Sequence, residues 1–393
     1  MTLTFGEARA CVLREVGVSM GTETVSLSEA AERVLAEQIL ADRDYPPFSR
    51  SARDGFAVRV ADLPGELRVI GEVRAGEVFS GSVVAGQAVE IMTGAPLPEG
   101  ADGVVMVEHT ERTGDRARIG RSIESGDNFT PQGSEARSGD VVLSCGVRIG
   151  YAEIALLATV GCTKILVYQR PRVAIIATGD EIVEPGEQPA PHQIRNSNAA
   201  SLAVQVCRAG GIPNILPIAR DNYESTRTQI QKGLEADLLL LSGGVSAGKY
   251  DLVEKVLAEF GAEFFFDRVK IQPGQPLVFG KAQGKYFFGL PGNPASTMIT
   301  FETIARAALE RAQGLREPAL PLMRARLTCP FHQKTGITRF LPAQLSLDGA
   351  TIQPLVSQGS GDVAALARCN AFLVTDPNRA DWMAGDDIQV LGK

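Results

Sequence analysis

The chain has few of the side chains on which most catalytic constellations depend. Its 393 residues include three histidines and six cysteines. His109, His192 and His332 are far apart in the sequence, so no Ser-His-Asp or Cys-His arrangement can be assembled from them. The cysteines form no CxxC pair, which argues against a structural zinc site and favours buried, reduced thiols. Carboxylates, backbone groups and a metal ion are therefore expected to carry any chemistry.

An excess of positive charge and long apolar runs are missing as well. The 39 Lys and Arg against 46 Asp and Glu give a net charge of −7, which argues against a nucleic-acid binder. No apolar run approaches the length that spans a bilayer. The first residues mix acids with apolar residues, which is typical of an amphipathic helix and not of a signal peptide. We expect a cytoplasmic protein that contacts neither nucleic acid nor membrane.

The N-terminal part of the chain changes its pattern twice. Residues up to about Leu40 look helical, because Ser26–Leu40 begins with serines that can cap a helix and keeps helical periodicity. Short β-rich runs then alternate with glycine turns from Leu67 to Glu111. A strand and a helix return over Val141–Val167. The predicted units are a discontinuous helical and β domain I over 1–40 and 133–168, and a small β domain II over 41–132.

From Arg172 onward strands and helices alternate, which predicts a doubly wound α/β sheet with ligands at the carboxyl ends of its strands. After about Leu320 the pattern is β again. The predicted fold class is therefore α/β plus β, in an elongated multidomain chain. A central doubly wound α/β domain III covers 169–317, small β domains lie on its N-terminal side and at the C-terminus, and the latter, domain IV, covers 318–393.

The segment LLLLSGGVSAGKYD, residues 238–251, is the most informative part of the α/β region. An apolar run ending in glycines indicates a buried strand of a parallel sheet. The turn that follows has little side-chain bulk, so its N–H groups can reach a phosphate or another oxyanion. Asp251 can then hold a divalent ion against that anion. The turn residues expected to bind ligand are Ser242, Gly243, Gly244, Ser246 and Gly248.

Three other strand ends of the α/β region carry similar groups. Any one of them is also compatible with an ordinary turn or helix cap, but together they favour a site. Glu181, Asp221 and Asp251 would repel one another unless a cation lay between them, and Mg²⁺ bridging phosphate oxygens fits this cluster. The candidate residues at these ends are Thr178, Gly179, Asp180 and Glu181; Asp221; and Pro291, Gly292, Asn293 and Pro294.

Two further regions are candidates for function. The segment 267–276 contains Arg268, Lys270 and a rigid turn at Pro273-Gly274, and it can present charge to an anion. Polar loops surround Asp54 and Thr93-Gly94, and loops of this kind often carry function.

Taken in order, these motifs resemble one family, the molybdopterin molybdenumtransferases (MoeA), which includes the gephyrin E-domain. The resemblance covers essentially the whole chain. Its signatures are SARDGFAV, IMTGAPLPEGADGVVM, TGDE, SGGVSAGKYD, PGQPLVFG and GLPGNPAS.

The resemblance implies the last step of molybdenum cofactor assembly. Molybdenum from molybdate is inserted into adenylylated molybdopterin, and AMP is released with the help of Mg²⁺. It also implies a homodimer in which Asp54 reaches the α/β site of the other subunit. A MogA-like adenylyltransferase would act upstream, and molybdoenzymes or their chaperones would receive the product. The residues carried over are the acids Asp54, Glu181, Asp221 and Asp251, and Ser360 near the molybdate.

The chain departs from the family pattern at several positions. Glu135 stands where the family has an aspartate, and the usual Lys-Pro-Gly-Lys turn has glutamines at 272 and 275. Arg268 replaces a lysine, and the usual Gly-Arg pair is Gly336-Ile337, with Arg339 two residues further on. We expect Arg268, Lys270 or Arg339 to replace the lost charge. Two alternatives stay open: a molybdopterin-binding carrier or scaffold without insertase activity, and a tungsten-preferring insertase.

Overall fold

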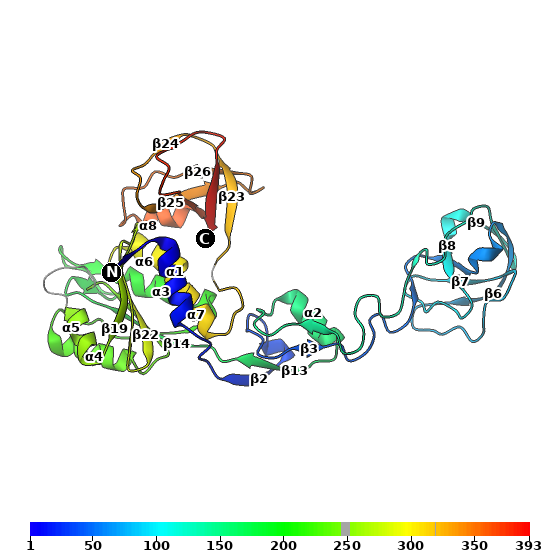
Figure 1. Ribbon diagram of the computed structural model, residues 1–393, viewed down its shortest axis with the longest axis horizontal. Coiled ribbons are helices and arrows are strands. Elements are labelled where there is room, and N and C mark those ends of the chain that lie inside the picture. Colours follow the sequence, from blue (N-terminus) through cyan, green and yellow to red (C-terminus); the bar gives the residue numbers. More distant parts are fainter. Residues whose placement is uncertain (245–251, 319) are drawn as a thin grey trace.

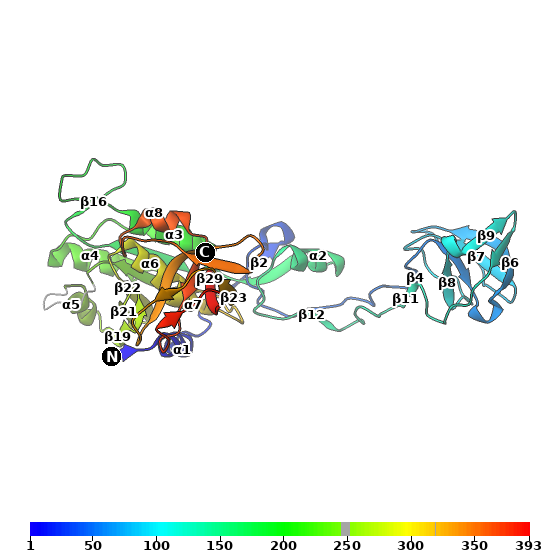
Figure 2. The same cartoon turned by 90° about the horizontal axis from the view of Figure 1, so that it is seen from above.

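The computed structural model is an elongated molecule with three parts (Figure 1). A large α/β body carries the C-terminal β domain, a narrow arm leads away from the body, and a separate β domain lies at the far end of the arm (Figure 2). The structure describes residues 1–244, 252–318 and 320–393. In this described part, no helix has both the length and the apolar character required to cross a membrane.

The strands of the body form one twisted, mixed sheet. Four neighbours, β17, β14, β18 and β22, run parallel. The sheet order within the described residues is β1 (Thr2–Leu3), β19 (Glu263–Val269), β21 (Pro276–Ala282), β22 (Lys285–Leu290), β18 (Leu238–Ser242), β14 (Arg172–Ala177) and β17 (Ile212–Ile215). The predicted buried strand after residue 237 is therefore confirmed as β18.

Helices cover both faces of this sheet, so the predicted doubly wound fold is confirmed. Alternate residues of β14 enter different cores: Val173 and Ile175 face one, and Ala174 and Ile176 face the other. This is expected, because side chains alternate along a strand. The first core contains α1 (Phe5–Glu15), α3 (Ser197–Arg208), α6 (Pro294–Thr300), the π-helical turn η4 (Phe301–Ala305) and α7 (Arg306–Ala312), and the second contains α4 (Tyr223–Gly233) and α5 (Leu252–Glu259).

The first residues of the chain lie in the body, whereas we expected residues 1–40 to pack with 133–168. Strand β1 pairs with β19 through Leu3 and Val269. Helix α1 begins at a capping box, in which Thr4 and Glu7 bond each other's backbone N–H, and it buries Ala8 and Val12 in the body's core. Residues 22–40 do pack with the later segment in the arm, so the prediction fails only for the first residues, whose apolar side chains join the core of the body.

In the arm, the segment Ser26–Leu40 does not form the predicted helix. Ser26 does form a capping box with Glu29, but it caps only the short 3₁₀ turn η1 (Leu27–Glu29). Val34 and Leu35 then form β-bridges with Arg148 and Val167. The apolar residues are buried as expected, but pairing with the later segment overrides their helical propensity. The arm contains β2 (Thr22–Ser26), β13 (Lys164–Tyr168), β3 (Ile39–Leu40), β12 (Val141–Leu143) and α2 (Tyr151–Thr159).

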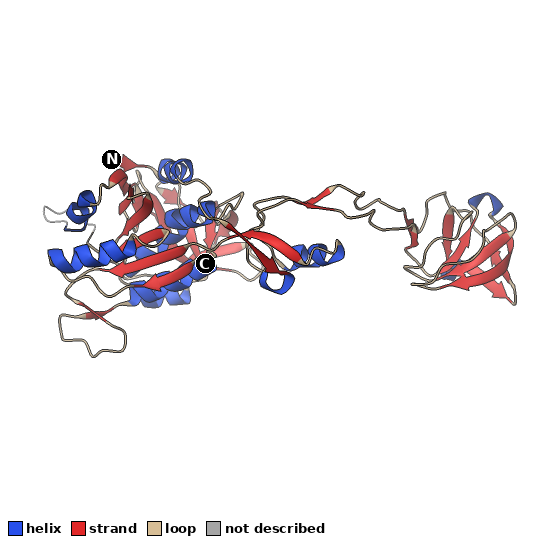
Figure 3. Ribbon diagram, turned by 90° about the horizontal axis from the view of Figure 1, so that it is seen from below, coloured by secondary structure: helices blue, strands red, loops and turns tan. Residues whose placement is uncertain are grey.

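The distal domain is an all-β unit, and the neck that leads to it is mostly loop (Figure 3). In β5, a Cβ at Gly55 would lie 1.9 Å from the Val105 carbonyl oxygen, so only glycine lets these two strands approach. The sheet order is β8 (Gly103–Met106), β5 (Gly55–Val58), β7 (Gln87–Ile91), β6 (Gly65–Val73), β10 (Arg116–Ile119) and β9 (Thr110–Thr113). The turns η2 (Val60–Asp62) and η3 (Val107–His109) lie beside it, and β4 (Arg50–Ser51) pairs with β11 (Phe129–Thr130) in the neck.

The C-terminal domain closes into a barrel-like sheet, because β25 pairs with β27 as well as with β26. Strand β20 (Ile271–Gln272), which comes before this domain in the sequence, pairs with β25, and Gln272 lies opposite Arg339. This pairing ties the domain to the body beside the predicted Pro-Gly turn. Its elements are β23 (Leu322–Leu327), β24 (Phe331–His332), β25 (Thr338–Leu345), β26 (Thr351–Pro354), α8 (Val363–Arg368), β27 (Ala371–Val374), β28 (Asp381–Trp382) and β29 (Asp387–Gly392).

Candidate functional site

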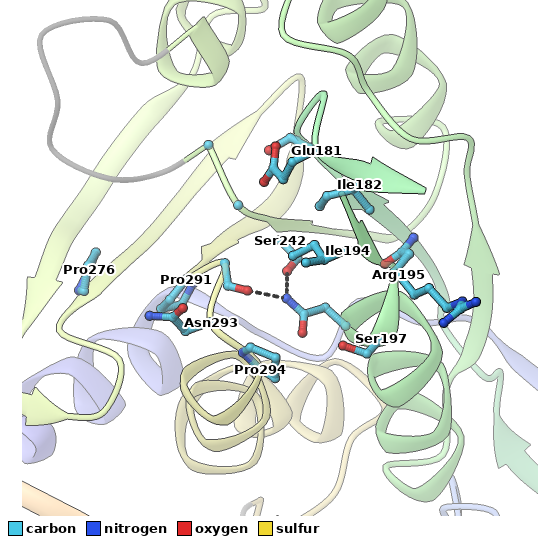
Figure 4. Close-up of a pocket in the computed structure, with 16 residues that line it drawn as sticks. Glu181, Ile182, Ile194, Arg195, Ser197, Ser242, Pro276, Pro291, Asn293 and Pro294 are labelled. Atoms are coloured by element: carbon cyan, nitrogen blue, oxygen red, sulfur yellow. Dashed lines mark hydrogen bonds between the residues drawn. The ribbon is translucent and has the colours of Figure 1, made fainter. Parts of the chain in front are cut away.

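A cavity of about 430 Å³ opens at the carboxyl ends of β14, β18 and β22. Figure 4 shows Pro291 and Asn293 on one side of Ser242, and Ile194 and Arg195 on the other. This is the edge where a parallel sheet of this type binds ligands. The predicted residues that the structure brings together here are Thr178, Glu181, Ser242, Gly243, Gly244, Pro291, Gly292, Asn293 and Pro294.

Glycines keep the backbone of this edge accessible. Gly243 and Gly244 have φ of 92° and 64°, a region that other residues rarely adopt. A Cβ on either one would also lie within 3.0 Å of the Thr178 hydroxyl oxygen. Gly179 has φ of 141°, and a Cβ there would meet the Glu181 carboxylate at 2.4 Å. The sequence motif thus keeps side-chain bulk away from this edge, while the Gly243 and Gly179 N–H groups donate to the Leu290 and Ala219 carbonyls.

The sequence interpretation missed one wall of the cavity. The short parallel pair β15 (Ile182–Val183) and β16 (Ile194–Arg195) leads into the N-terminus of α3. The Asn196 side chain caps this helix, and Asn198 lies on the cavity lining with 8% exposure. The segment RNSN before an apolar-periodic run is a helix start, but nothing local shows that this helix start faces the other strand ends.

Three buried polar side chains form the floor. Asn198 Nδ2 donates to Ser242 Oγ at 2.9 Å and to the Gly292 carbonyl at 2.7 Å. The Thr178 hydroxyl and the Asn198 carbonyl oxygen have no hydrogen-bond partner in the part of the chain that the structure describes. Buried polar atoms are normally paired, so these two are positioned for a ligand.

Thr178→Val is expected to stabilise the free protein and to weaken ligand binding. Valine has the same shape, and removing an unpaired buried hydroxyl should raise the free energy of unfolding by about 1–2 kcal/mol. Urea unfolding and calorimetric titration with AMP measure the two effects. Thr226→Val is the matched control, because the buried Thr226 hydroxyl donates to the Arg220 carbonyl and its loss should destabilise. A destabilised Thr178→Val that binds AMP normally would contradict this role.

Of the predicted acidic cluster of Glu181, Asp221 and Asp251, the structure describes the first two. Asp180 and Asp221 bond each other's backbone, with the Asp221 N–H donating to Asp180 Oδ1 at 3.1 Å and the Asp180 N–H to Asp221 Oδ2 at 3.3 Å. Neither residue is on the cavity lining, whereas Glu181 is. Within the described ranges, no group of three His, Cys, Asp or Glu side chains is placed to hold a metal ion. The candidates Ser246, Gly248 and Asp251 lie outside the described residues.

A second cavity, of about 660 Å³, lies where the body meets the C-terminal domain. It shares Pro276 with the first cavity, so the two are neighbours. Among the described residues that line it, Arg339 is the one charged side chain, and its buried Nε has no partner there. Gln272 and Gln275 also line it, together with the predicted residues Pro273, Gly274 and Ser360.

The structure separates the three cations proposed to replace the family lysines. Arg339 is half-buried on β25 and lines the second cavity, as does Ile337 just before that strand. Arg268 and Lys270 have exposed side chains on and just after β19 and do not belong to the lining of either cavity. Arg339 is therefore the candidate that can meet an anion in this cavity.

Asp54 and Thr93 lie together in the distal domain, which the arm separates from the body that contains both cavities (Figure 1). Asp54 Oδ1 accepts from the Thr93 backbone N–H at 2.6 Å and from its hydroxyl at 2.7 Å. The backbone bond, and then the hydroxyl bond, hold the pKa of Asp54 below its usual value. Gly94, with φ of 83°, completes the turn that presents the N–H. The carboxylate is exposed and ionised.

Thr93→Val is expected to raise the pKa of Asp54 part of the way to its ordinary value. The hydroxyl bond is lost, while the larger contribution from the backbone N–H remains. Because the pKa of Asp54 is lowered, its hydrogen bonds stabilise the fold until the pH falls through that pKa. In the variant, the remaining bond from the Thr93 backbone N–H should therefore be lost at a higher pH. A ¹³C NMR titration of the Asp54 carboxyl measures the shift. Thr110→Val in the same domain should leave it unchanged, and an unchanged pKa in Thr93→Val would refute the assignment.

Glu135 lies in the neck and is not on the lining of either cavity. Its exposed carboxylate forms an ion pair with Arg50 at 3.0 Å, and it lines a separate groove with Tyr45 and Asp140. The structure therefore does not bring Glu135 to the two cavities within one chain.

Family models match three consecutive parts of the chain. The MoeA N-terminal region (domain I and II) matches residues 3–161, a probable molybdopterin binding domain matches 174–311, and the MoeA C-terminal region (domain IV) matches 324–392. The residues that line both cavities all belong to the latter two regions. Fold and site thus define a multidomain protein built around a molybdopterin-binding type of domain.

Relatives over the whole chain make the assignment specific. The molybdopterin molybdenumtransferase of Staphylococcus epidermidis RP62A is 35% identical over 377 residues, covering 93% of this chain and 90% of that protein. The same enzyme of Staphylococcus aureus Mu50 is 34% identical, covering 95% and 91%. This chain therefore belongs to the molybdopterin molybdenumtransferase (MoeA) family, a family of enzymes, as the motifs predicted.

Solved structures agree along the full length. The molybdopterin biosynthesis MoeA protein of Pyrococcus horikoshii OT3 has a TM-score of 0.83 at 27% identity, and each chain covers 100% of the other. A second crystal structure of a Pyrococcus MoeA protein has a TM-score of 0.75 at 32% identity, covering 100% of this chain and 99% of that one. The elongated architecture is therefore that of the family.

Proposed function

We propose that this protein transfers molybdenum from molybdate to adenylylated molybdopterin, releasing AMP and forming molybdenum cofactor. The observation that carries the proposal is the pair of neighbouring cavities that share Pro276. One has an open glycine turn and two hydroxyl donors suited to a phosphate, and the other has a half-buried cation suited to an oxyanion. A reaction that joins a phosphorylated ligand and an oxyanion requires two such sites side by side.

The first cavity is the proposed site of adenylylated molybdopterin. The hydroxyls of Thr178 and Ser242 are donors for phosphate oxygens, whereas the Gly243 N–H already donates to the Leu290 carbonyl. Ile182 and Ile194 supply apolar surface for a ring. In the second cavity Arg339 would pair with molybdate, and Ser360 and the glutamines at 272 and 275 would add neutral contacts.

Mg²⁺ is proposed as the metal of the first cavity. Glu181 is a carboxylate on its lining, which is the donor type that Mg²⁺ prefers, and we assign Asp221 and Asp251 as its other candidate ligands. When bound, the ion would neutralise phosphate charge. Chelation of divalent ions should then abolish AMP release, and added Mg²⁺ should restore it.

A homodimer is proposed because Asp54 is separated from the cavities of its own chain by the arm. In such a dimer the distal domain of one subunit would lie at the cavities of the other. The substrate would come from a MogA-like adenylyltransferase, and molybdoenzymes or their chaperones would receive the product.

A carrier that binds molybdopterin without inserting metal is the second candidate. The observation that favours it is the lining of the second cavity, where Gln272 and Gln275 stand in the place of the family lysines. With one cation instead of three, the site could hold molybdate too weakly for turnover. A tungsten-preferring insertase would use the same residues.

AMP release from adenylylated molybdopterin, with Mg²⁺ and with or without molybdate or tungstate, tests these functions. Molybdate-dependent release with formation of active cofactor is expected. Tight binding without release would support the carrier instead, and release with tungstate alone would support the tungsten enzyme.

A further inference from the structure

We propose that Asn198 is a positioning residue, which turns the Ser242 hydroxyl toward a ligand phosphate and offers its own carbonyl oxygen to a hydrogen-bond donor of the same ligand. The inference rests on the proposed function in one respect, the phosphorylated nature of the ligand. It adds a residue and a recognition pattern that the motifs do not assign.

The orientation of the Asn198 amide is fixed by its neighbours. One end of the amide lies 2.7 Å from the Gly292 carbonyl oxygen and 2.9 Å from Ser242 Oγ. A carbonyl oxygen can only accept, so the end that faces Gly292 must be the NH₂ group. The carbonyl oxygen of Asn198 is therefore the other end, which is buried and has no partner among the described residues.

This orientation also determines the direction of the Ser242 hydroxyl. Asn198 donates to Ser242 Oγ, so the Ser242 proton cannot point back along that bond. Ser242 is 1% exposed and lies on the cavity lining, where the hydroxyl of Thr178 is also free to donate. Two hydroxyl donors thus converge on the cavity floor and match an oxyanion such as a phosphate.

The free carbonyl oxygen adds a requirement for a donor. A buried acceptor without a partner destabilises the protein until a donor reaches it, and Asn198 is 8% exposed. A ligand that places an O–H or N–H group close to its phosphate satisfies both features together. Nucleotides and pterin phosphates belong to this class, whereas inorganic phosphate supplies the anion with no fixed donor beside it.

The two hydrogen bonds of the Asn198 amide join three segments that are far apart in the sequence. Asn198, on α3, holds Ser242 at the end of β18 and Gly292 after β22. Substitution of Asn198 should therefore act through Ser242, and the two residues should behave as one unit. Independent residues would instead contribute additively.

The experiment is a double-mutant cycle with the full-length protein. AMP affinity is measured by calorimetry for the wild type, Ser242→Ala, Asn198→Asp and the double variant. Asn198→Asp keeps the size of the side chain but replaces the donor by an acceptor. Loss of a hydrogen bond to a charged group should weaken AMP binding about ten- to a hundred-fold in each single variant, and the double variant should lose little more than either one.

Two controls separate positioning from misfolding. Ser201→Ala lies on the same helix and removes a bond to the Asn198 backbone carbonyl, not to its amide, so AMP affinity should stay near the wild-type value. Ser242→Ala leaves the Asn198 bond to Gly292 in place, so it keeps the test valid if Asn198→Asp unfolds. Inorganic phosphate is the second probe, and its affinity should fall in Ser242→Ala as that of AMP does, because both ligands present phosphate oxygens to this hydroxyl.

The outcomes are distinguishable from failure of the proposed function. Additive losses of AMP affinity in the double variant would overturn the positioning role while leaving insertase activity possible. A coupled loss in a protein that never releases AMP would support the positioning role and refute the insertase. A wild type that binds neither AMP nor phosphate would overturn the inference.

Discussion

Asp54→Asn is expected to lower molybdate-dependent AMP release by about a hundredfold or more, the scale of losing a catalytic proton donor or acceptor. Asp54 is exposed and contacts only Thr93 among the hydrogen bonds of its side chain in the described structure. Asparagine can still accept from Thr93, so the free energy of unfolding should change by about 0.5 kcal/mol or less. Turnover and urea unfolding of the same preparation measure both effects.

A heterodimer experiment tests whether Asp54 acts on the other subunit. Chains carrying Asp54→Asn and chains carrying Arg339→Ala are coexpressed with different tags, and the mixed dimer is isolated. If Asp54 acts across the dimer, one of the two sites has both residues intact and activity returns. If it acts within its own chain, every site carries one defect and activity stays low. Inactive mixed dimers with active wild-type dimers would refute the proposed arrangement.

Arg339→Ala is expected to raise the KM for molybdate by about ten- to a hundred-fold, because a charge-assisted contact to the oxyanion is lost. The physical reason is that Arg339 is the one charged side chain among the described residues of the second cavity, and its Nε has no protein partner there. High molybdate should restore most of the kcat. Steady-state kinetics at several molybdate concentrations separate the two constants.

Matched variants make the Arg339 prediction specific. Arg326→Ala removes an exposed arginine of the same domain and should leave the KM unchanged, and Lys270→Ala tests the rejected alternative. Gln272→Lys and Gln275→Lys should lower the KM by restoring positive charge around the anion. A normal KM in Arg339→Ala, or a raised KM in Lys270→Ala, would contradict the assignment.

Several features of the fold were predictable because they are encoded locally. The apolar run at 238–242 became strand β18, and the glycine turn after it has the positive φ values that its composition indicates. The alternation of strands and helices gave the doubly wound sheet. The predicted helix over Ser26–Leu40 was wrong for an equally physical reason. The apolar spacing of this segment fits a helix, but its residues pair with residues more than a hundred positions later in the sequence.

The candidate site was likewise predictable only in part from the sequence. By itself, the sequence determined the family of the chain and predicted that the turns at Thr178, Ser242 and Pro291 meet at one edge of the sheet, because turn chemistry and motif order are local properties. Only the tertiary structure decided that Asn198 meets Ser242, 44 positions away, and that Arg339 enters a cavity while Arg268 and Lys270 do not. It also decided that Asp54 lies at the far end of an arm. These relations depend on how distant segments pack, and no local pattern records which side chains will share one cavity.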